Sequence, residues 1–123
     1  MADYLIDLTI FTAVFRGDDR LRRLIENLDS AVDSIVYLEL LQATRNSSEA
    51  ERVEKYLTLF ELIYFDKKVA QRAFELTRLY SKNFGLRLPD SIIAATCLEH
   101  DLTLITHNVK DFQFIKDLKI FTL

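Results

Sequence analysis

The chain has few of the residues that cross-link a fold or interrupt it. Its 123 residues include one cysteine, one proline and two glycines. Because Cys97 has no partner in the chain, it cannot form an internal disulfide, and a reducing compartment is the simpler expectation. The scarcity of proline and glycine predicts short loops, and we find no linker, internal repeat or low-complexity tract. The length fits one compact domain spanning residues 1–123.

Long apolar runs and an excess of positive charge are also missing. No stretch approaches the roughly 18 apolar residues of a membrane span, and residues 1–5 lack the basic start and apolar core of a signal peptide. We therefore expect a cytoplasmic protein without a membrane segment. The formal net charge of −3 argues against a generally basic nucleic-acid coat protein. A nuclease remains compatible with this charge, because a metal ion offsets a local acidic site.

Apolar residues are abundant and follow two alternating patterns. Half of the residues are hydrophobic and 28% are charged, which is typical of a globular protein. Short apolar runs predict strands at residues 4–6, 34–37, 62–65 and 102–105, with a possible fifth at residues 119–122. Because helical patterns separate these runs, we expect an α/β fold: a mostly parallel sheet of four or five strands, with helices on both faces.

Signals for helix starts stand between the expected strands. They are Thr9, Asp18, a Ser-Glu-Ala-Glu capping box at Ser48, Lys67 and Asp90. The helix from Lys67 is the clearest, and Gly85 is expected to end it. A further helix directly after residue 37 carries Glu39. Residues 91–98 are apolar on most sides, which predicts a central helix with Cys97 in the core.

Four carboxylates lie beyond the expected strands or at helix starts: Asp7, Glu39, Asp90 and Asp111. Each has an ordinary explanation, such as a turn, a helix cap or a solvated loop. Four acids at the carboxyl ends of parallel strands are a coincidence that turns and caps do not require, and ligand sites form at that edge. Like charges gathered there stay ionised most easily around a cation. Oxygen ligands suit Mg²⁺ or Mn²⁺ better than zinc.

These residues resemble a known family along essentially the whole chain. The first segments that match are Asp7 and Glu39-Leu40-Leu41, and the more specific ones are residues 88–95 (LPDSIIAA) and residues 104–112 (LITHNVKDF). The pattern resembles the PIN-domain ribonucleases, and among them most closely the VapC-type toxins of prokaryotic toxin–antitoxin pairs.

The resemblance implies an endoribonuclease whose acidic pocket binds Mg²⁺ or Mn²⁺ and cleaves RNA with a metal-activated water, and which a cognate antitoxin neutralises. Asp7, Glu39, Asp90 and Asp111 match the acidic positions, at which the family binds metal and performs catalysis. Nearby polar residues match positions that support the acids rather than bind the ion directly: Thr9, Thr106 and Asn108. Candidate phosphate contacts are Arg16, Arg45, Arg87, His107 and Lys110.

One departure from the family pattern keeps a second function open. Family members usually follow the first Asp with Thr or Ser, whereas Leu8 follows Asp7 here and removes a hydroxyl that could orient the acid. An inactive PIN domain that binds RNA or a protein is therefore an alternative. A phosphorelay receiver is less compatible, because the first strand supplies only Asp7 and the last lacks a following lysine.

The first expected helix suggests a protein partner. Ile10, Phe11, Val14 and Phe15 leave little polar surface on it, although a surface helix normally needs only one apolar stripe. We expect part of the surface of Phe11 and Phe15 to meet another chain, either a second copy in a homodimer or an antitoxin segment. A fully internal core is the competing interpretation.

Overall fold

Four parallel strands form the centre of the computed structural model, which describes all 123 residues. The strands are β1 (Tyr4–Ile6), β2 (Ser30–Asp33), β3 (Glu61–Ile63) and β4 (Thr103–Ile105). The helices are α1 (Leu8–Phe15), α2 (Asp19–Asn27), α3 (Ser34–Gln42), α4 (Ser47–Leu57), α5 (Lys67–Phe84) and α6 (Leu88–His100), followed by the 3₁₀ turn η1 (Val109–Asp111). The expected α/β fold with a parallel sheet is confirmed.

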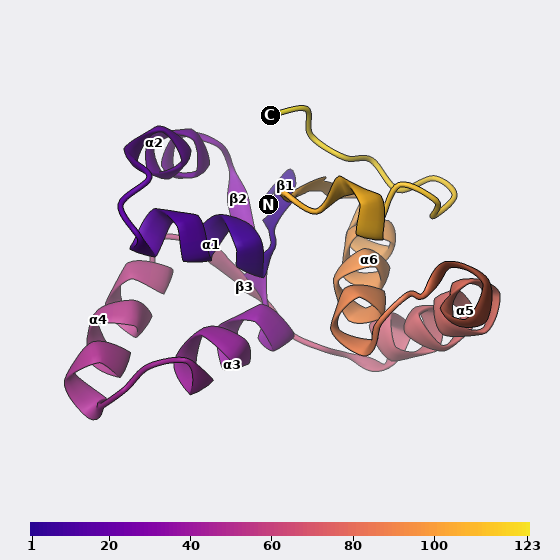
Figure 1. Cartoon of the computed structure of the whole chain (residues 1–123), viewed down its shortest axis with the longest axis horizontal. Helices are drawn as coiled ribbons and strands as arrows, with labels where there is room; N and C mark the ends of the chain where they lie inside the picture. Colours follow the sequence, from indigo (N-terminus) through magenta and orange to yellow (C-terminus); the bar gives the residue numbers. More distant parts are fainter.

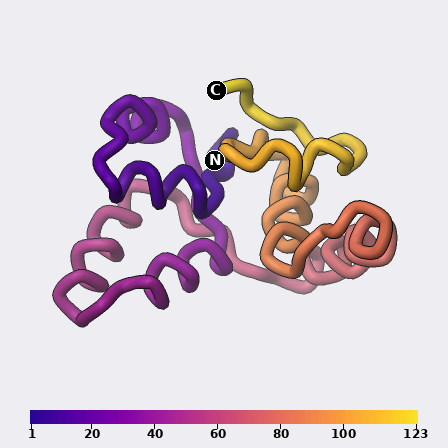
Figure 2. Tube along the Cα trace, viewed as in Figure 1, coloured from indigo at the N-terminus to yellow at the C-terminus, as the bar shows by residue number.

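The strand order β3-β2-β1-β4 explains how the helices divide between the two faces. The chain steps outward from β1 to β2 to β3 and then returns to β4 on the far side of β1. Crossovers between parallel strands are right-handed, so reversing the direction moves the connecting helices to the opposite face. Figure 1 shows α1 to α4 on one side of the strands and α5 and α6 on the other. Figure 2 shows β1 and β4, from opposite ends of the chain, close together.

The strand expected at residues 34–37 is wrong, because these residues form the start of α3. The strand lies earlier, at Ser30–Asp33, where all four residues are buried. A carboxylate oxygen of Asp33 accepts a hydrogen bond of 2.9 Å from the Val36 backbone N–H and so begins the helix. The local cap and burial against the sheet outweigh the preference of Ile35 and Val36 for strands.

Three further expectations need correction. Asn46, rather than Ser48, caps α4, since its side chain accepts a hydrogen bond from the Glu49 backbone N–H. Thr9 lies inside α1, and Asp7 is the residue that caps it. The fifth strand at residues 119–122 reduces to one bridge between Leu104 and Ile120. A short C-terminal segment therefore lies beside β4 without extending the sheet.

Helices α5 and α6 follow the sequence pattern closely. Gly85, with a φ of 72°, ends α5 in the left-handed conformation that glycine adopts without strain. Asp90 is in the first turn of α6, two residues after it begins. Cys97 is buried, as expected of a core residue. None of the helices combines the length and the apolar character needed to cross a membrane.

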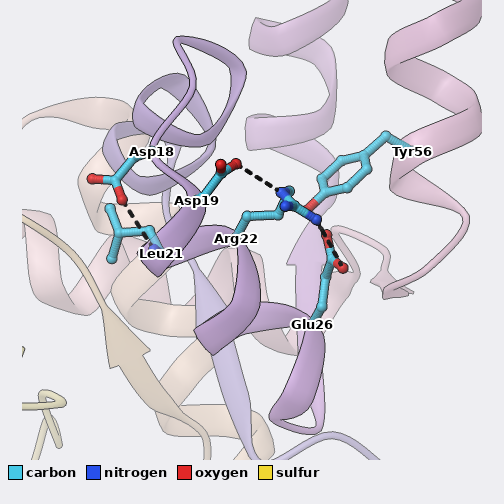
Figure 3. Close-up of polar contacts among 6 residues, drawn as sticks. All are labelled: Asp18, Asp19, Leu21, Arg22, Glu26 and Tyr56. Carbon is cyan, nitrogen blue, oxygen red and sulfur yellow. Dashed lines mark hydrogen bonds and ion pairs between the residues drawn. The ribbon is translucent and has the colours of Figure 1, made fainter.

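Aromatic and polar contacts connect the helices of the other face. Figure 3 shows Arg22 of α2 pairing with Asp19 at 3.2 Å, while the Tyr56 hydroxyl of α4 donates a 2.8 Å hydrogen bond to Glu26. Burial and this hydrogen bond raise the pKa of Tyr56. The Tyr56 ring also packs edge-on against Phe15 of α1. Helix α4 is thereby joined to both α1 and α2.

The expected interface on α1 is wrong for one of its two rings. Phe11 is completely buried and packs edge-on against Phe60 at a centroid distance of 5.3 Å. Phe15 remains 42% exposed. Only Phe15 is therefore accessible to a partner, because Phe11 is covered, in part by Phe60 in the segment after α4.

Candidate active site

A pocket of about 190 Å³ opens at the carboxyl edge of the sheet. The structure brings all four expected acids to it, from the turn between β1 and α1 and from α3, α6 and η1. The residues that line it are Asp7, Leu8, Thr9, Glu39, Arg87, Pro89, Asp90, Ile93, Asn108 and Asp111. Residues from opposite ends of the chain, Asp7 and Asp111, thus share one concave surface, as expected for strand ends in a parallel sheet.

Asp7 is the most deeply placed of these acids, with 4% of its surface exposed. Its Oδ1 accepts hydrogen bonds from the Thr9 backbone N–H (2.8 Å) and the Thr9 hydroxyl (2.5 Å). Its Oδ2 accepts a 2.5 Å hydrogen bond from the Thr106 hydroxyl. Both oxygens are therefore held, which satisfies a buried carboxylate and fixes its orientation.

The two threonines that hold Asp7 are themselves anchored. The Thr9 hydroxyl accepts a hydrogen bond from the His107 backbone N–H, and the Thr106 hydroxyl accepts one from the Asn108 backbone N–H. Each hydroxyl thus has a fixed acceptor role and directs its proton toward Asp7. The orientation of Asp7 does not depend on a hydroxyl at residue 8.

The other three acids are more exposed than Asp7. Glu39 lies on the second turn of α3 and Asp90 on the first turn of α6, and both are half-buried. Asp111 ends η1 and is exposed. The pocket therefore has one rigid acid at its base and three acids toward its opening.

Burial and mutual repulsion act on the acids of the pocket. Burial, followed by the charges of Asp111 and Asp7, raises the pKa of Asp90 to about 6. Burial also raises the pKa of Glu39, with Arg87 opposing the shift. A cation placed among these carboxylates would reduce the repulsion and favour their ionised forms.

The donor set fits a hard divalent cation that keeps some of its water. All four acids supply oxygen ligands, which Mg²⁺ and Mn²⁺ prefer. No group of three or more His, Cys, Asp or Glu side chains is close enough to enclose an ion. Mg²⁺ commonly binds through one or two carboxylates and completes its shell with waters. An open pocket with spaced carboxylates suits that mode better than a closed structural site.

One of the five basic or histidine candidates for phosphate contacts lines the pocket. Arg87 directly precedes α6, is exposed, and lies at the pocket with the acids. Arg45 is instead paired with Glu49 at 3.2 Å on an exposed surface. His107 and Lys110 border a neighbouring cavity beside Asn108 and Asp111, and Arg16 ends α1 and lines none of these cavities.

A fifth carboxylate near the pocket was missed by the sequence analysis. Asp33 ends β2 next to β1 and is 2% exposed. Burial, with smaller contributions from Glu39 and Asp7, raises its pKa to about 6. Because the strand was expected at residues 34–37, Asp33 was not recognised as a residue at the carboxyl end of a strand. The signal that could have revealed it is an Asp after Ala31-Val32, three residues before a backbone N–H that it can cap.

Comparisons with known proteins agree with the fold. A family model described as "PIN domain" matches residues 4–117. The protein named Ribonuclease VapC1 from Rickettsia felis is 30% identical over 97% of this chain and 95% of its own length.

Solved structures share the architecture over almost the whole chain. A toxin–antitoxin complex from Klebsiella pneumoniae contains a chain that matches with a TM-score of 0.80 and 29% identity, covering 94% of each chain. VapBC2 from Rickettsia felis, solved with a DNA fragment from its promoter, matches with a TM-score of 0.76 and 26% identity over 96% of each chain. The phosphorelay receiver considered above is not supported by these matches.

Proposed function

The chain belongs to the PIN-domain family, in its VapC group, and we propose that it is a metal-dependent endoribonuclease toxin controlled by an antitoxin. The observation that supports this most strongly is the pocket that gathers Asp7, Glu39, Asp90 and Asp111. The related protein from Rickettsia felis is named a ribonuclease, which agrees with RNA as the substrate. The organisation of the acids agrees with hydrolysis of a phosphodiester bond.

One or two of the four acids would bind Mg²⁺ or Mn²⁺ directly and the others would contact its waters, with Asp7 as the rigid anchor. A divalent ion bound there supplies Lewis-acid stabilisation of the phosphate charge and lowers the pKa of water. Thr9 and Thr106 keep both Asp7 oxygens oriented, so little reorganisation is needed when a cation arrives. Asn108 contributes through its backbone N–H, which fixes the Thr106 hydroxyl.

Arg87 is the side chain best placed to bind the substrate. It is exposed and lines the same pocket as the acids, and its guanidinium can bind a phosphate through two hydrogen bonds. In an otherwise acidic pocket, this positive charge would offset repulsion of the RNA backbone. Arg87 therefore orients the scissile phosphate in this proposal.

An antitoxin and a second copy are the proposed protein partners. The solved relatives include a toxin–antitoxin complex and VapBC2, which supports an antitoxin for this chain as well. The half-exposed Phe15 ring of α1 is one surface available to a partner. A homodimer remains part of the proposal, since contacts between copies would also bury exposed apolar side chains.

The test is cleavage of labelled RNA by the purified chain with Mn²⁺, with Mg²⁺ and after chelation. We expect cleavage that requires the metal and falls about 100-fold or more in Asp90→Asn, because a loss of ~3 kcal/mol corresponds to that factor. Asp3→Asn is the matched control, since Asp3 is an exposed acid at the opposite end of the sheet.

Two other outcomes would change the assignment. If the chain binds RNA but never cleaves it with any divalent ion, the inactive binding module is the better description. If cleavage continues unchanged after chelation or in Asp90→Asn, the acidic pocket is not the site of the reaction.

A further inference from the structure

Asp33 has a buried carboxylate oxygen with no hydrogen-bond partner. Its Oδ1 caps α3 at the Val36 N–H, but its Oδ2 is the only buried side-chain nitrogen or oxygen of the chain that lacks a partner. A helix cap needs one acceptor oxygen, which serine or asparagine supplies without a charge. Burying an unpaired carboxylate is costly. The cap alone therefore does not explain why a charged residue occupies this position.

The sheet register places Asp33 beside the acidic pocket. Leu5 pairs with Ala31, so the same register places Asp33, the last residue of β2, opposite Asp7, which directly follows β1. Both acids raise the pKa of the buried Cys97 thiol on α6, after the larger effect of burial. Asp33 does not itself line the pocket. Its buried carboxylate thus lies beside Asp7 and at the start of the helix that carries Glu39, outside the lining of the pocket.

We propose that Asp33 is a fifth carboxylate of the acidic site, which acts from outside the lining of the pocket. Its negative charge strengthens the binding of a divalent cation at the pocket, and its cap on α3 positions Glu39 toward that cation. The inference rests on the proposed function and deepens it. A buried charge interacts more strongly with a nearby cation than an exposed charge does, because less water screens it.

The chain contains a matched control for this proposal. Asp66 caps α5 directly after β3, and its Oδ1 accepts a 2.9 Å hydrogen bond from the Val69 N–H, the same geometry as at Asp33. Asp66 is exposed and does not line the acidic pocket. Asparagine at either position keeps a cap oxygen and removes the charge. Comparing Asp33→Asn with Asp66→Asn therefore distinguishes the effect of a buried charge from the effect of capping.

The experiment measures Mn²⁺ affinity by calorimetry at pH 7.5 in wild type, Asp33→Asn and Asp66→Asn, without RNA. We expect Asp33→Asn to bind Mn²⁺ about tenfold more weakly, in the range seen when groups that support metal ligands are removed. Asp66→Asn should bind as the wild type does. Equal affinity in all three proteins would overturn the proposal and leave Asp33 as a cap alone.

Two additional results keep the proposal testable. If Asp33→Asn does not fold, Asp33→Ser supplies a cap oxygen on a smaller side chain. Weaker Mn²⁺ binding by Asp33→Ser would then support the proposal, and unchanged binding would refute it. If the wild type binds no Mn²⁺, the metal site of the proposed function fails and this inference fails with it. Normal Mn²⁺ binding in both Asp33 variants would refute only the role of Asp33.

Discussion

Four helices begin with an Asp whose carboxylate accepts a backbone N–H, yet these caps lie in two different environments. Asp18 and Asp66 cap α2 and α5 at the surface. Asp7 and Asp33 cap α1 and α3 and are almost completely buried. The carboxylates of the exposed pair can accept further hydrogen bonds from water. Those of the buried pair can accept them only from donors within the protein. The same kind of helix cap therefore has a structural role at the periphery and a candidate functional role at the centre of the sheet.

The two buried caps also differ from one another. Asp7 has hydrogen-bond donors on both oxygens, and two threonines fix its orientation. Asp33 has an oxygen without a donor. A fully satisfied buried carboxylate is suited to hold a ligand in a fixed position, while an unsatisfied one gains most from a nearby cation. Burial does not distinguish Asp7 from Asp33, but the number of hydrogen-bond donors that reach each carboxylate does.

The largest expected effect comes from comparing Asp7→Asn with Asp18→Asn. Both changes keep a cap oxygen, but Asp7→Asn removes the rigid charged ligand of the proposed metal site. We expect metal-dependent RNA cleavage to fall about 100-fold or more, equivalent to ~3 kcal/mol of lost transition-state stabilisation. Asp18→Asn should leave cleavage unchanged. Similar losses in both variants, measured with folding checked by circular dichroism, would contradict the distinction between central and peripheral caps.

The next effect is on stability and depends on pH. In the folded chain the pKa of Asp33 is about 6, above its ordinary value of 3.8, because of burial. Between these values the unfolded carboxyl loses its proton while the folded one retains it, so this group lowers stability as pH rises from about 4 to 6. Above that window the full penalty remains, up to about 3 kcal/mol.

Urea denaturation in the presence of a chelator measures this penalty. The difference in the free energy of unfolding between Asp33→Asn and wild type should increase as pH rises from 4.5 to 7.5. The corresponding difference for Asp66→Asn should change much less, because Asp66 is exposed. A pH-independent difference for Asp33→Asn would show that this carboxylate carries no burial penalty.

Much of the fold could be predicted from the sequence because its signals are local. The apolar run at β1, the stripe of α5 and its Gly85 terminus are each specified by residues that lie close together in the chain. The incorrect prediction of β2 shows that local signals can mislead. Ile35 and Val36 have strand-forming side chains, but the cap at Asp33 and packing against the sheet make them helical.

Asp7, Asp90 and Asp111 could be predicted because each lies at or near a strand or helix boundary, whereas Glu39 lies on the second turn of α3 and was proposed next to a strand that the structure places earlier. The arrangement around Asp7 could not, since the hydrogen bond from Thr106 joins residues that follow two different strands, β1 and β4. The role of Asp33 escaped prediction for a related reason. An Asp before a helix is normally interpreted as a cap, and only tertiary structure shows whether water reaches its second oxygen.

A smaller effect is expected from Thr106→Val, which removes a donor from Asp7 while keeping the shape of the side chain. The buried Oδ2 of Asp7 then lacks its partner, which costs about 2 kcal/mol of folding stability. Cleavage should fall about tenfold, since the acid is no longer held in one orientation. Thermal denaturation and RNA cleavage measure the two effects. Thr103→Val, at the end of β4 that lies away from Thr106, is the control.

The smallest effect is expected from Asp66→Ala at the periphery. This substitution removes the hydrogen bond to the Val69 N–H and so weakens the start of α5. Loss of a helix cap typically costs about 1 kcal/mol. Because Asp66 lies outside the acidic pocket, Mn²⁺ affinity and RNA cleavage should match wild type when measured well below the melting temperature. A loss of Mn²⁺ affinity similar to that of Asp33→Asn would mean that capping itself shapes the pocket, and burial would no longer separate the two kinds of cap.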